Sequence, residues 1–380
     1  MSLIVQICPC YVDLAKETGG VANIVRTICL IASERKIRVL LLCGNREMGR
    51  RIADPGCNKI SDFLEVEVFD QRKHPSLGPF SGLKKRIQGL PRDAVAHVHT
   101  CFSSFSDMSM KWLNNRGIPF VFTPHGKLSE GMMKSNAIAK KIWWNSFTKY
   151  QVNKSSAIGL SSEYEVGNIL SLGLQLPRCL TVPNGFTRPD QRDCPPPIAI
   201  YGQYILYLGY IDPRKQPEFL VKAFAVSEAR ESHHLVFVGP DTYGFQSCVQ
   251  SAVIELGLQK QVFFHGPAYG NEKWSLLDNA ACLCLPSIAE GLPLVLCEAL
   301  GAGIPSIYSF GCNFPEIEKS GAGICIYGFD VNEWANTIDS VCLDSQVSTS
   351  MRMKSRRLSE KYRAENVVDQ WCEVYERIRK

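Results

Sequence analysis

Short apolar segments alternate with helical segments along almost the whole chain, and this alternation restricts the possible folds more than any other feature. Strands that alternate with helices form parallel sheets, because each crossover helix returns the chain to the same end of the sheet. The pattern predicts an α/β protein made of two Rossmann-like domains with parallel sheets. The predicted strands are 3–8, 38–43, 66–69, 94–98, 119–122, 157–161, 179–183, 204–208, 235–238, 262–265 and 281–285. The predicted helices are 21–34, 106–114, 140–154, 163–172, 218–229, 246–256, 272–279, 293–300 and most of 331–380.

The length of the chain also favours two domains. A chain of 380 residues exceeds what one hydrophobic core usually serves. Three consecutive prolines at 195–197 cannot continue a regular element, so they predict the linker. We expect an N-terminal domain over 1–194 and a C-terminal domain over 198–361.

The stretch from Leu285 to Ile307 carries the clearest chemical signal. A buried strand ends at Leu285, a loop follows, and a helix is predicted from about Pro293 to Leu300. We expect Gly301 and Gly303 to end this helix. The first N–H groups of a helix have no partner within it and lie at the positive end of its dipole. The entry to this helix therefore suits a phosphate group.

Particular residues fit this phosphate site. The amides of Leu294 and Val295 would face the anion, and Gly291 precedes them in the loop. Glu298 lies about one turn further along, where a carboxylate can accept hydrogen bonds from both hydroxyls of a ribose. Glu290 lies on the loop, where it would face the group attached to the bound phosphate. Acceptors for sugar hydroxyls on both sides of an anion site suit a nucleotide sugar.

An alternative interpretation makes both glutamates ordinary surface residues. Against it, Glu298 is the only charged residue between Gly291 and Glu316. A carboxylate among apolar side chains needs a partner. We therefore favour a ligand-binding role for Glu298 and Glu290.

Two features of the first half carry weaker signals. Gly19 and Gly20 open the helix at 21–34, where glycines let the backbone approach a phosphate or sugar closely. A plain tight turn explains the same pair. His125 directly follows the predicted strand 119–122, at the end of the sheet where ligands bind in doubly wound folds. A lone histidine is more often structural, but Gly126 after it admits close approach.

Composition excludes several classes of protein. The net charge of +5 is a mild excess, and the basic residues are spread out, so we expect no nucleic-acid partner. Sixteen cysteines are scattered, and the closest pairs, Cys8 with Cys10 and Cys282 with Cys284, lack the spacing of metal ligands. Free buried thiols suit a reducing cytoplasm, and we predict a cytoplasmic protein with no metal site. The N-terminus resembles a first strand and not a signal peptide.

The segment 140–154 joins aromatic side chains to lysines. It contains Trp143, Trp144, Phe147 and Tyr150. Basic and aromatic side chains together are typical of helices on anionic membrane surfaces, which would place the protein peripherally on the inner face of the plasma membrane. The alternative is an amphipathic helix that packs on its own sheet with its lysines in solvent.

The motifs together resemble glycosyltransferase family 4, the retaining, metal-independent GT-B glycosyltransferases of group 1. The matching segments are YILYLGYIDPRKQPEFLVKAF, LVFVGPD, VFFHGP, LPSIAEGLPLVLCEALGAGIPSI and NFPEIEKSGAGICI in the second half, and GGVANIV, TPHGKLSEGM and LTVPNGF in the first. Bacterial enzymes that build lipopolysaccharide, capsule and exopolysaccharide look most similar.

The resemblance implies an architecture and an activity. Two Rossmann-like domains would face a central cleft, with an acceptor-binding first domain and a donor-binding second domain. A C-terminal helix at about 362–380 would cross back to the first domain, anchored by Trp371 and Tyr375. The donor would be a UDP- or GDP-sugar and the acceptor a glycan or a lipid-linked glycan, and no cofactor is expected.

The resemblance also implies roles for individual residues. Glu298 would hold the ribose and Glu290 would face the donor sugar. Lys215 matches the lysine that neutralises the diphosphate leaving group, and His125 would lie over the donor sugar. The donor-binding residues implied are Gly19, Gly20, Arg214, Gly239, Phe263, Gly291, Leu294, Val295 and Glu298.

This chain departs from the family pattern in two places. Tyr210 stands where the family usually has Arg, and Gln216 stands where it prefers Gly. One of two expected phosphate cations is therefore missing, and our hypothesis is that Arg214 replaces it. Two other functions remain open: a weak or inactive nucleotide-sugar-binding relative, and a nucleotide-sugar epimerase or hydrolase on the same scaffold.

Overall fold

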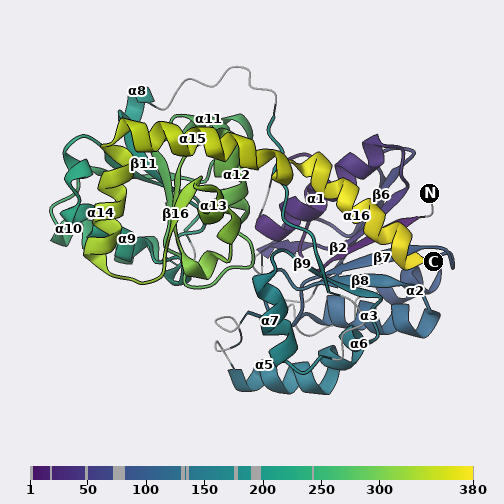
Figure 1. Ribbon diagram of the computed structural model, residues 1–380. Helices are drawn as coiled ribbons and strands as arrows, with labels where there is room; N and C mark the ends of the chain where they lie inside the picture. Colours follow the sequence, from purple (N-terminus) through teal and green to yellow (C-terminus); the bar gives the residue numbers. More distant parts are fainter. Residues whose placement is uncertain are drawn as a thin grey trace. The chain divides into compact units, whose positions relative to one another are not determined.

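A computed structural model describes residues 3–17, 19–47, 50–71, 82–129, 133, 137–174, 179–189, 198–241 and 244–379 (Figure 1). The chain forms two compact units. Unit 1 comprises Met1–Gly185 and Ala364–Lys380, and unit 2 comprises Phe186–Arg363. The predicted linker at 195–197 lies outside the described residues. The predicted domains divided the chain near this linker, whereas the units divide between Gly185 and Phe186 and again between Arg363 and Ala364.

Unit 1 contains an eight-stranded sheet in the order β10-β9-β8-β7-β1-β2-β6-β5. All neighbours are parallel except β5 and β6, which pair antiparallel. The strands of this sheet are β1 Ile4–Cys8, β2 Val39–Gly44, β5 Gly56–Lys59, β6 Leu64–Phe69, β7 Val95–His99, β8 Phe120–Thr123, β9 Ala157–Leu160 and β10 Cys179–Thr181. A separate antiparallel pair joins β3 Arg46–Glu47 to β4 Arg50–Arg51.

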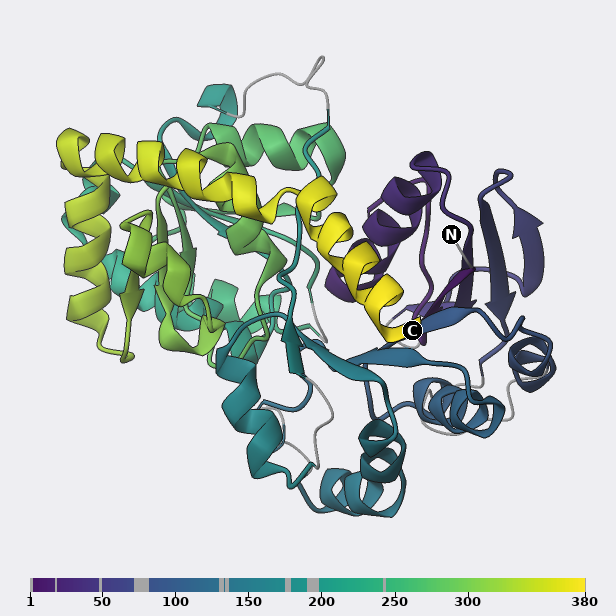
Figure 2. The ribbon, with the colours of Figure 1, turned by 45° about the vertical axis from the view of Figure 1, so that its right-hand side comes forward.

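Helices cover both faces of this sheet. The helices of unit 1 are α1 Gly20–Glu34, α2 Leu83–Gln88, α3 Ser104–Arg116, α5 Ala137–Trp143, the π-helix η1 Trp144–Thr148, α6 Lys149–Asn153, α7 Tyr164–Ser171 and α16 Ala364–Arg379. The helices α1 and α16 lie side by side (Figure 2), and their apolar side chains share one core with alternate residues of the strands. Trp371 and Tyr375 of α16 are buried in that core. The helices α2, α3 and α6 bury their apolar side chains against the other face.

Unit 2 contains a six-stranded parallel sheet in the order β13-β12-β11-β14-β15-β16. Numbered within the unit, this order is 3-2-1-4-5-6, the order of a doubly wound dinucleotide-binding fold. The strands are β11 Tyr204–Leu208, β12 His234–Val238, β13 Val262–Gly266, β14 Cys282–Leu285, β15 Ser306–Ser309 and β16 Gly323–Ile326.

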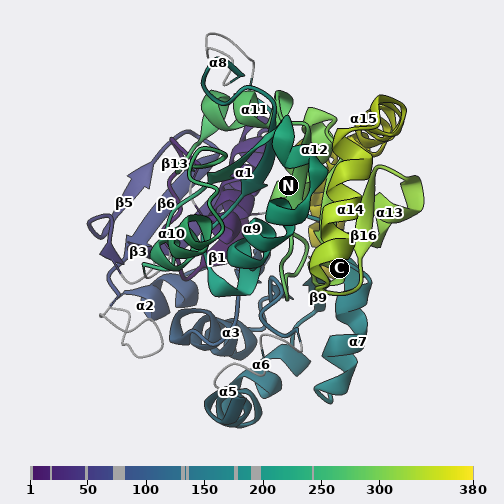
Figure 3. The ribbon, with the colours of Figure 1, turned by 90° about the vertical axis from the view of Figure 1, so that its left-hand side faces the viewer.

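Two helical layers enclose this second sheet. The α-helices of unit 2 are α8 Ile198–Tyr201, α9 Pro217–Val226, α10 Gln246–Glu255, α11 Gly270–Asp278, α12 Leu294–Ala302, α13 Pro315–Ser320, α14 Val331–Cys342 and α15 Ser345–Ser359. Short 3₁₀ turns are η2 Pro213–Lys215, η3 Glu228–Glu231, η4 Phe310–Cys312 and η5 Glu360–Tyr362. The helices α9, α10 and α14 share a core with one face of the sheet (Figure 3), and α11, α12 and α13 share a core with the other. Among the helices that the structure describes, none combines the length and the apolar character needed to cross a membrane.

The structure corrects the predicted end of the helix after β14. Gly301 does not stop α12, which continues to Ala302 and ends at Gly303 in the left-handed conformation. Gly301 instead makes room for a neighbour, because a Cβ there would lie 2.4 Å from the ring of Phe186. The helix α13 begins at Pro315, in agreement with the preference for proline in a first helical turn.

Candidate functional site

The candidate site in unit 2 lies where the strand order reverses. The strand β11 is followed by connections that lead to β12 on one side, while β14 lies on its other side. At such a switch point, the loops after the two central strands diverge and leave room for a ligand at their carboxyl ends. The loop after β11 contains Arg214 and Lys215, and the loop after β14 contains Glu290. These loops touch, since the Ile288 N–H donates to the Arg214 carbonyl at 2.9 Å.

Glycines let the chain pack closely at this edge. Gly239 has φ +144°, and a Cβ there would lie 1.9 Å from the Gly209 carbonyl oxygen. A Cβ on Gly209, which has φ +142°, would lie 3.4 Å from Nζ of Lys215. The lysine side chain therefore runs along the backbone at the end of β11. Gln216 has φ +52°, in the left-handed region that glycine adopts without steric cost. This backbone conformation agrees with the family's preference for Gly at this position.

Lys215 and Glu290 form a largely buried ion pair. Lys215 Nζ lies 2.8 Å from Glu290 Oε1, and the two side chains are 9% and 14% exposed. The Ser287 hydroxyl donates to the same carboxylate at 2.8 Å. Burial alone raises the pKa of Glu290, but Lys215, Arg214 and these hydrogen bonds outweigh it and hold the pKa below its ordinary value of 4.5. The carboxylate is therefore charged at neutral pH, and the predicted sugar-facing Glu290 and diphosphate-binding Lys215 lie together.

Glu298 has a protein partner that the sequence analysis missed. Lys273 Nζ of α11 lies 2.7 Å from Glu298 Oε1 of α12, and the side chains are 8% and 5% exposed. The requirement that Glu298 find a partner is thus met at least in part by Lys273. A helical signal could have revealed it: Lys273 shares a face with Leu276 and Leu277, three and four residues on, and both are buried.

The helix α12 begins within a residue of its predicted start at Pro293. Its first residue is Leu294, followed by Val295, and the residue before them is Pro293, whose side chain has no group to cap the helix. Gly291 lies in the loop just before. Phe263, one of the implied donor-binding residues, is on β13 and packs against Tyr201 with ring centroids 5.4 Å apart.

Arg214 lies in the loop that carries Lys215. The Asp212 carboxylate caps η2 by accepting the Arg214 N–H at 2.8 Å, and the guanidinium Nε lies 3.9 Å from the same carboxylate. The positive charge of Arg214 also helps to lower the pKa of Glu290, after the larger effect of Lys215. At Tyr210, where the family has Arg, the backbone carbonyl accepts a hydrogen bond from the Tyr207 hydroxyl at 2.8 Å.

The remaining predicted residues lie in unit 1. His125 follows β8 with φ +51°, and its Nε2 lies 2.9 Å from Nδ1 of His99. Burial, and then the Lys127 ammonium, lowers the pKa of His125 to about 3, so the ring is neutral at pH 7. Gly19 is the N-cap of α1 and Gly20 its first residue, with the Gly19 carbonyl accepting the Asn23 N–H at 2.9 Å.

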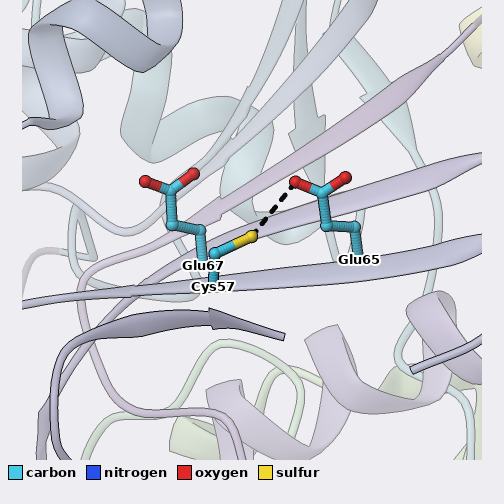
Figure 4. Close-up of side chains that lie close together, drawn as sticks. All are labelled: Cys57, Glu65 and Glu67. Carbon is cyan, nitrogen blue, oxygen red and sulfur yellow. Dashed lines mark hydrogen bonds between the residues drawn. The ribbon is translucent and has the colours of Figure 1, made fainter. Parts of the chain in front are cut away.

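One group of side chains has the residue types of a metal site, but its carboxylates are already paired with an arginine and its thiol is disfavoured as a thiolate. Cys57, Glu65 and Glu67 lie close together on β5 and β6 (Figure 4). Arg86 already pairs with both carboxylates, at 2.9 Å for Glu67. Burial and the neighbouring Glu65 raise the pKa of the Cys57 thiol, which disfavours the thiolate that metals bind. This group therefore carries no assignment.

Comparison with known proteins fits this geometry. Residues 199–359 match the family model of glycosyl transferases group 1, and residues 18–187 match that of glycosyltransferase family 4. The chain belongs to the group 1 glycosyltransferases of family 4 type. The two matches together span both units, so the family assignment covers most of the chain.

Two curated relatives show the level of similarity. An exopolysaccharide phosphotransferase of Streptomyces coelicolor is 28% identical over 214 residues, covering 54% of this chain and 21% of the relative. A D-inositol 3-phosphate glycosyltransferase of a Mycobacterium species is 29% identical over 140 residues, covering 36% of this chain and 31% of the relative. The chain thus spans less than a third of the length of these relatives.

Solved structures confirm the predicted GT-B fold. The sucrose-phosphate synthase of Thermosynechococcus elongatus has a TM-score of 0.79 at 17% identity, over 100% of this chain and 99% of that one. Anabaena HepE in complex with UDP has a TM-score of 0.70 at 17% identity, over 98% of this chain and 99% of that one. At this identity the likeness establishes the fold alone.

Proposed function

We propose that the protein transfers a sugar from a nucleoside diphosphate sugar to a glycan or lipid-linked acceptor, with retention of configuration and without a metal ion. The observation that carries this proposal is the buried Lys215–Glu290 pair at the switch point of unit 2. The family assignment supports it, as does the UDP bound by HepE. A role in bacterial surface polysaccharide synthesis is part of the proposal.

The proposed mechanism places positive charge where the leaving diphosphate develops negative charge. A departing diphosphate gains negative charge, which Lys215 and the first amides of α12 would stabilise as preorganised donors. The Lys215 ammonium would exchange Glu290 for phosphate oxygens when the donor binds, which frees the carboxylate to accept a sugar hydroxyl. The acceptor would attack from the face that the diphosphate leaves, and a phosphate oxygen would take its proton. These two sources of positive charge are our reason for proposing a reaction that needs no metal.

A nucleotide panel tests the donor site directly. We expect one of UDP, GDP and ADP, or one of their sugars, to raise the melting temperature in buffer without divalent metal. Glu298→Ala and Lys215→Ala should each lose this shift, because one removes the proposed ribose acceptor and the other the diphosphate cation. Glu218→Ala, which removes an exposed carboxylate from a surface pair with Lys222, is the matched control and should keep it. No shift with any nucleotide would contradict the proposal.

Tyr210 gives a specific reason to retain the inactive-relative alternative. It leaves the family's second phosphate cation to Arg214, which lies beside Asp212. A protein that binds the nucleotide sugar but neither transfers nor hydrolyses the sugar in the presence of acceptor glycans would fit that alternative. Release of free sugar without acceptor would instead favour a hydrolase.

We also propose that the segment 137–153 rests on an anionic membrane surface, with a different face from the one the sequence suggested. Trp144 is buried, and Trp143 donates to the buried Asp107 at 2.6 Å, so both tryptophans pack on unit 1. The exposed apolar side chains are Ile138 and Ile142, at 78% and 61% exposure. Four residues apart on α5, they share one helix face next to basic side chains, as interfacial helices do.

Negative charge introduced on that face tests the membrane proposal. We expect Ile138→Asp/Ile142→Asp to reduce co-sedimentation with vesicles of anionic lipid by about tenfold, because the change removes apolar area and adds repulsion. Ile254→Asp, at an isoleucine of α10 as exposed as Ile142, is the control and should bind as the parent does. Equal binding to anionic and zwitterionic vesicles by all variants would contradict the proposal.

A further inference from the structure

Buried polar side chains interrupt the mostly apolar sheet face of unit 1 under α16; besides Thr123 of β8, they include Gln6, His97 and His99. Gln6 lies on β1, and His97 and His99 lie on β7, two residues apart and therefore on the same face. All three are buried. Buried polar groups require hydrogen-bond partners, so this arrangement must be satisfied within the core.

These side chains form one continuous hydrogen-bond chain. The Gln6 amide nitrogen lies 3.0 Å from the Tyr375 hydroxyl of α16, and its carbonyl oxygen lies 2.8 Å from Nε2 of His99. Nδ1 of His99 lies 2.9 Å from Nε2 of His125. From Tyr375, a second branch reaches Nδ1 of His97 at 2.8 Å.

The three imidazoles joined by these hydrogen bonds are neutral. Burial is the largest cause that lowers the pKa of His97 and of His99 well below 6.5, and it lowers that of His125 to about 3. A neutral imidazole has one N–H donor and one acceptor nitrogen. Fixing the role of one ring nitrogen therefore fixes the role of the other.

The orientation of the Gln6 amide then sets the protons along the branch from Gln6 through His99 to His125. Its oxygen can only accept, so Nε2 of His99 carries the proton and Nδ1 of His99 accepts. Nε2 of His125 must then be the donor, which leaves Nδ1 of His125 with a free lone pair. Among the described residues, that Nδ1 is buried and has no hydrogen-bond partner. An unsatisfied buried acceptor is costly unless a ligand supplies the missing donor.

We propose that Tyr375, Gln6 and His99 are positioning residues that hold His125 in the tautomer whose Nδ1 accepts a hydrogen bond from a ligand hydroxyl. The identity of that ligand as a donor sugar rests on the proposed function. The tautomer itself does not, because the chain that sets it lies within unit 1.

The test is long-range ¹H–¹⁵N NMR of the histidine side chains in the full-length protein labelled at its seven histidines. The signals of His125 are identified by their loss in His125→Gln. We expect a pyridine-like Nδ1 and a pyrrole-like Nε2 at His125 without any ligand. A pyrrole-like Nδ1, which the reversed Gln6 amide would produce, overturns the proposal.

Two variants on α16 separate the hydrogen-bond chain from packing. Tyr375→Phe keeps the ring but removes the hydroxyl that accepts from Gln6, so both tautomers of His125 should become populated. Trp371→Phe alters the ring packed on His97, with centroids 4.5 Å apart, and should leave the tautomer unchanged. An unchanged tautomer in Tyr375→Phe, or the same mixture in both variants, overturns the role of the chain.

Kinetics connect the tautomer to function. If a sugar hydroxyl donates to His125, Tyr375→Phe should lower kcat/KM in proportion to the fraction of His125 that keeps the accepting tautomer, about twofold for an equal mixture, while Trp371→Phe stays at the parent value. A mixed tautomer in Tyr375→Phe with unchanged kcat/KM would overturn the assigned use of Nδ1. The expected tautomer in a protein with no transferase activity would uphold the positioning chain and contradict the proposed function.

Discussion

Replacement of Lys215 by methionine should lower kcat for sugar transfer at least about a hundredfold. Its ammonium is the buried cation at the carboxyl end of β11, 2.8 Å from Glu290, and is the proposed counter-charge of the diphosphate leaving group. Removal of one preorganised donor to a developing anion typically costs a factor of about 100–1,000 in kcat. Steady-state kinetics on the UDP- or GDP-sugar found in the nucleotide panel give the measurement.

The same substitution should change stability in a pH-dependent way. Methionine leaves Glu290 buried without its main cation, so the unfolding free energy at pH 7 should fall by about 3 kcal/mol. The lowered pKa of Glu290 means that the native pair stabilises the fold above pH 4.5 and loses this contribution as the pH falls through the folded-state pKa. In Lys215→Met, burial should raise the pKa of Glu290 instead. The difference between parent and variant, measured by urea unfolding, should therefore shrink towards acid pH.

Lys222→Met provides the matched control. Lys222 forms an ion pair with Glu218 at 2.8 Å, but both side chains are exposed to solvent. Such surface pairs contribute about 0–1 kcal/mol, so this variant should retain both activity and stability. A Lys215→Met enzyme with more than about a tenth of the parent kcat would contradict the leaving-group role, even if its stability fell as expected.

The sequence predicted where helices and strands lie along the chain far better than it predicted which strands and side chains lie next to one another in space. Hydrophobic periodicity located the strand β14 and the helix α12 nearly to the residue, because burial on one face or on both leaves a regular pattern. The meeting of Lys215 with Glu290 depends on β11 and β14 being adjacent, although 73 residues of strands and helices separate the two strands along the chain. Periodicity carries no information on strand order, and only the resemblance to a family brought these residues into one site.

Side-chain partners explain what the sequence analysis did not reveal. The aromatic and basic composition of 140–154 did not reveal that a buried Asp107 accepts hydrogen bonds from Trp143 and Thr148. The bond to Asp107 holds Trp143 against unit 1, Trp144 is buried in the core, and Ile138 and Ile142 stay exposed. The antiparallel pair of β3 and β4, with two residues in each strand, is likewise too short to give a periodic signal.

The second large effect is expected at the pair of Lys273 and Glu298. Lys273→Met should lower the unfolding free energy by about 3–5 kcal/mol, because it leaves Glu298 charged and buried without its cation. The double variant Lys273→Met/Glu298→Gln should recover to within about 1 kcal/mol of the parent, since neither uncompensated charge remains. Urea unfolding of the parent, both single variants and the double variant forms a double-mutant cycle, which measures the coupling free energy of the pair.

Glu298 has two proposed roles: it binds the ribose and it pairs with Lys273 inside the fold. Unfolding measurements alone cannot separate them, but nucleotide affinity can. A carboxylate that accepts ribose hydroxyls should lose about 1.5–3 kcal/mol of binding when it becomes an amide, which is about a ten- to hundredfold rise in Kd. This rise should persist in the double variant although its fold is restored, because the glutamine corrects the buried charge but not the missing acceptor. A double variant that is stable and binds the nucleotide as tightly as the parent would make the pair purely structural. Phosphate binding at the start of α12 would then have to supply the affinity without Glu298.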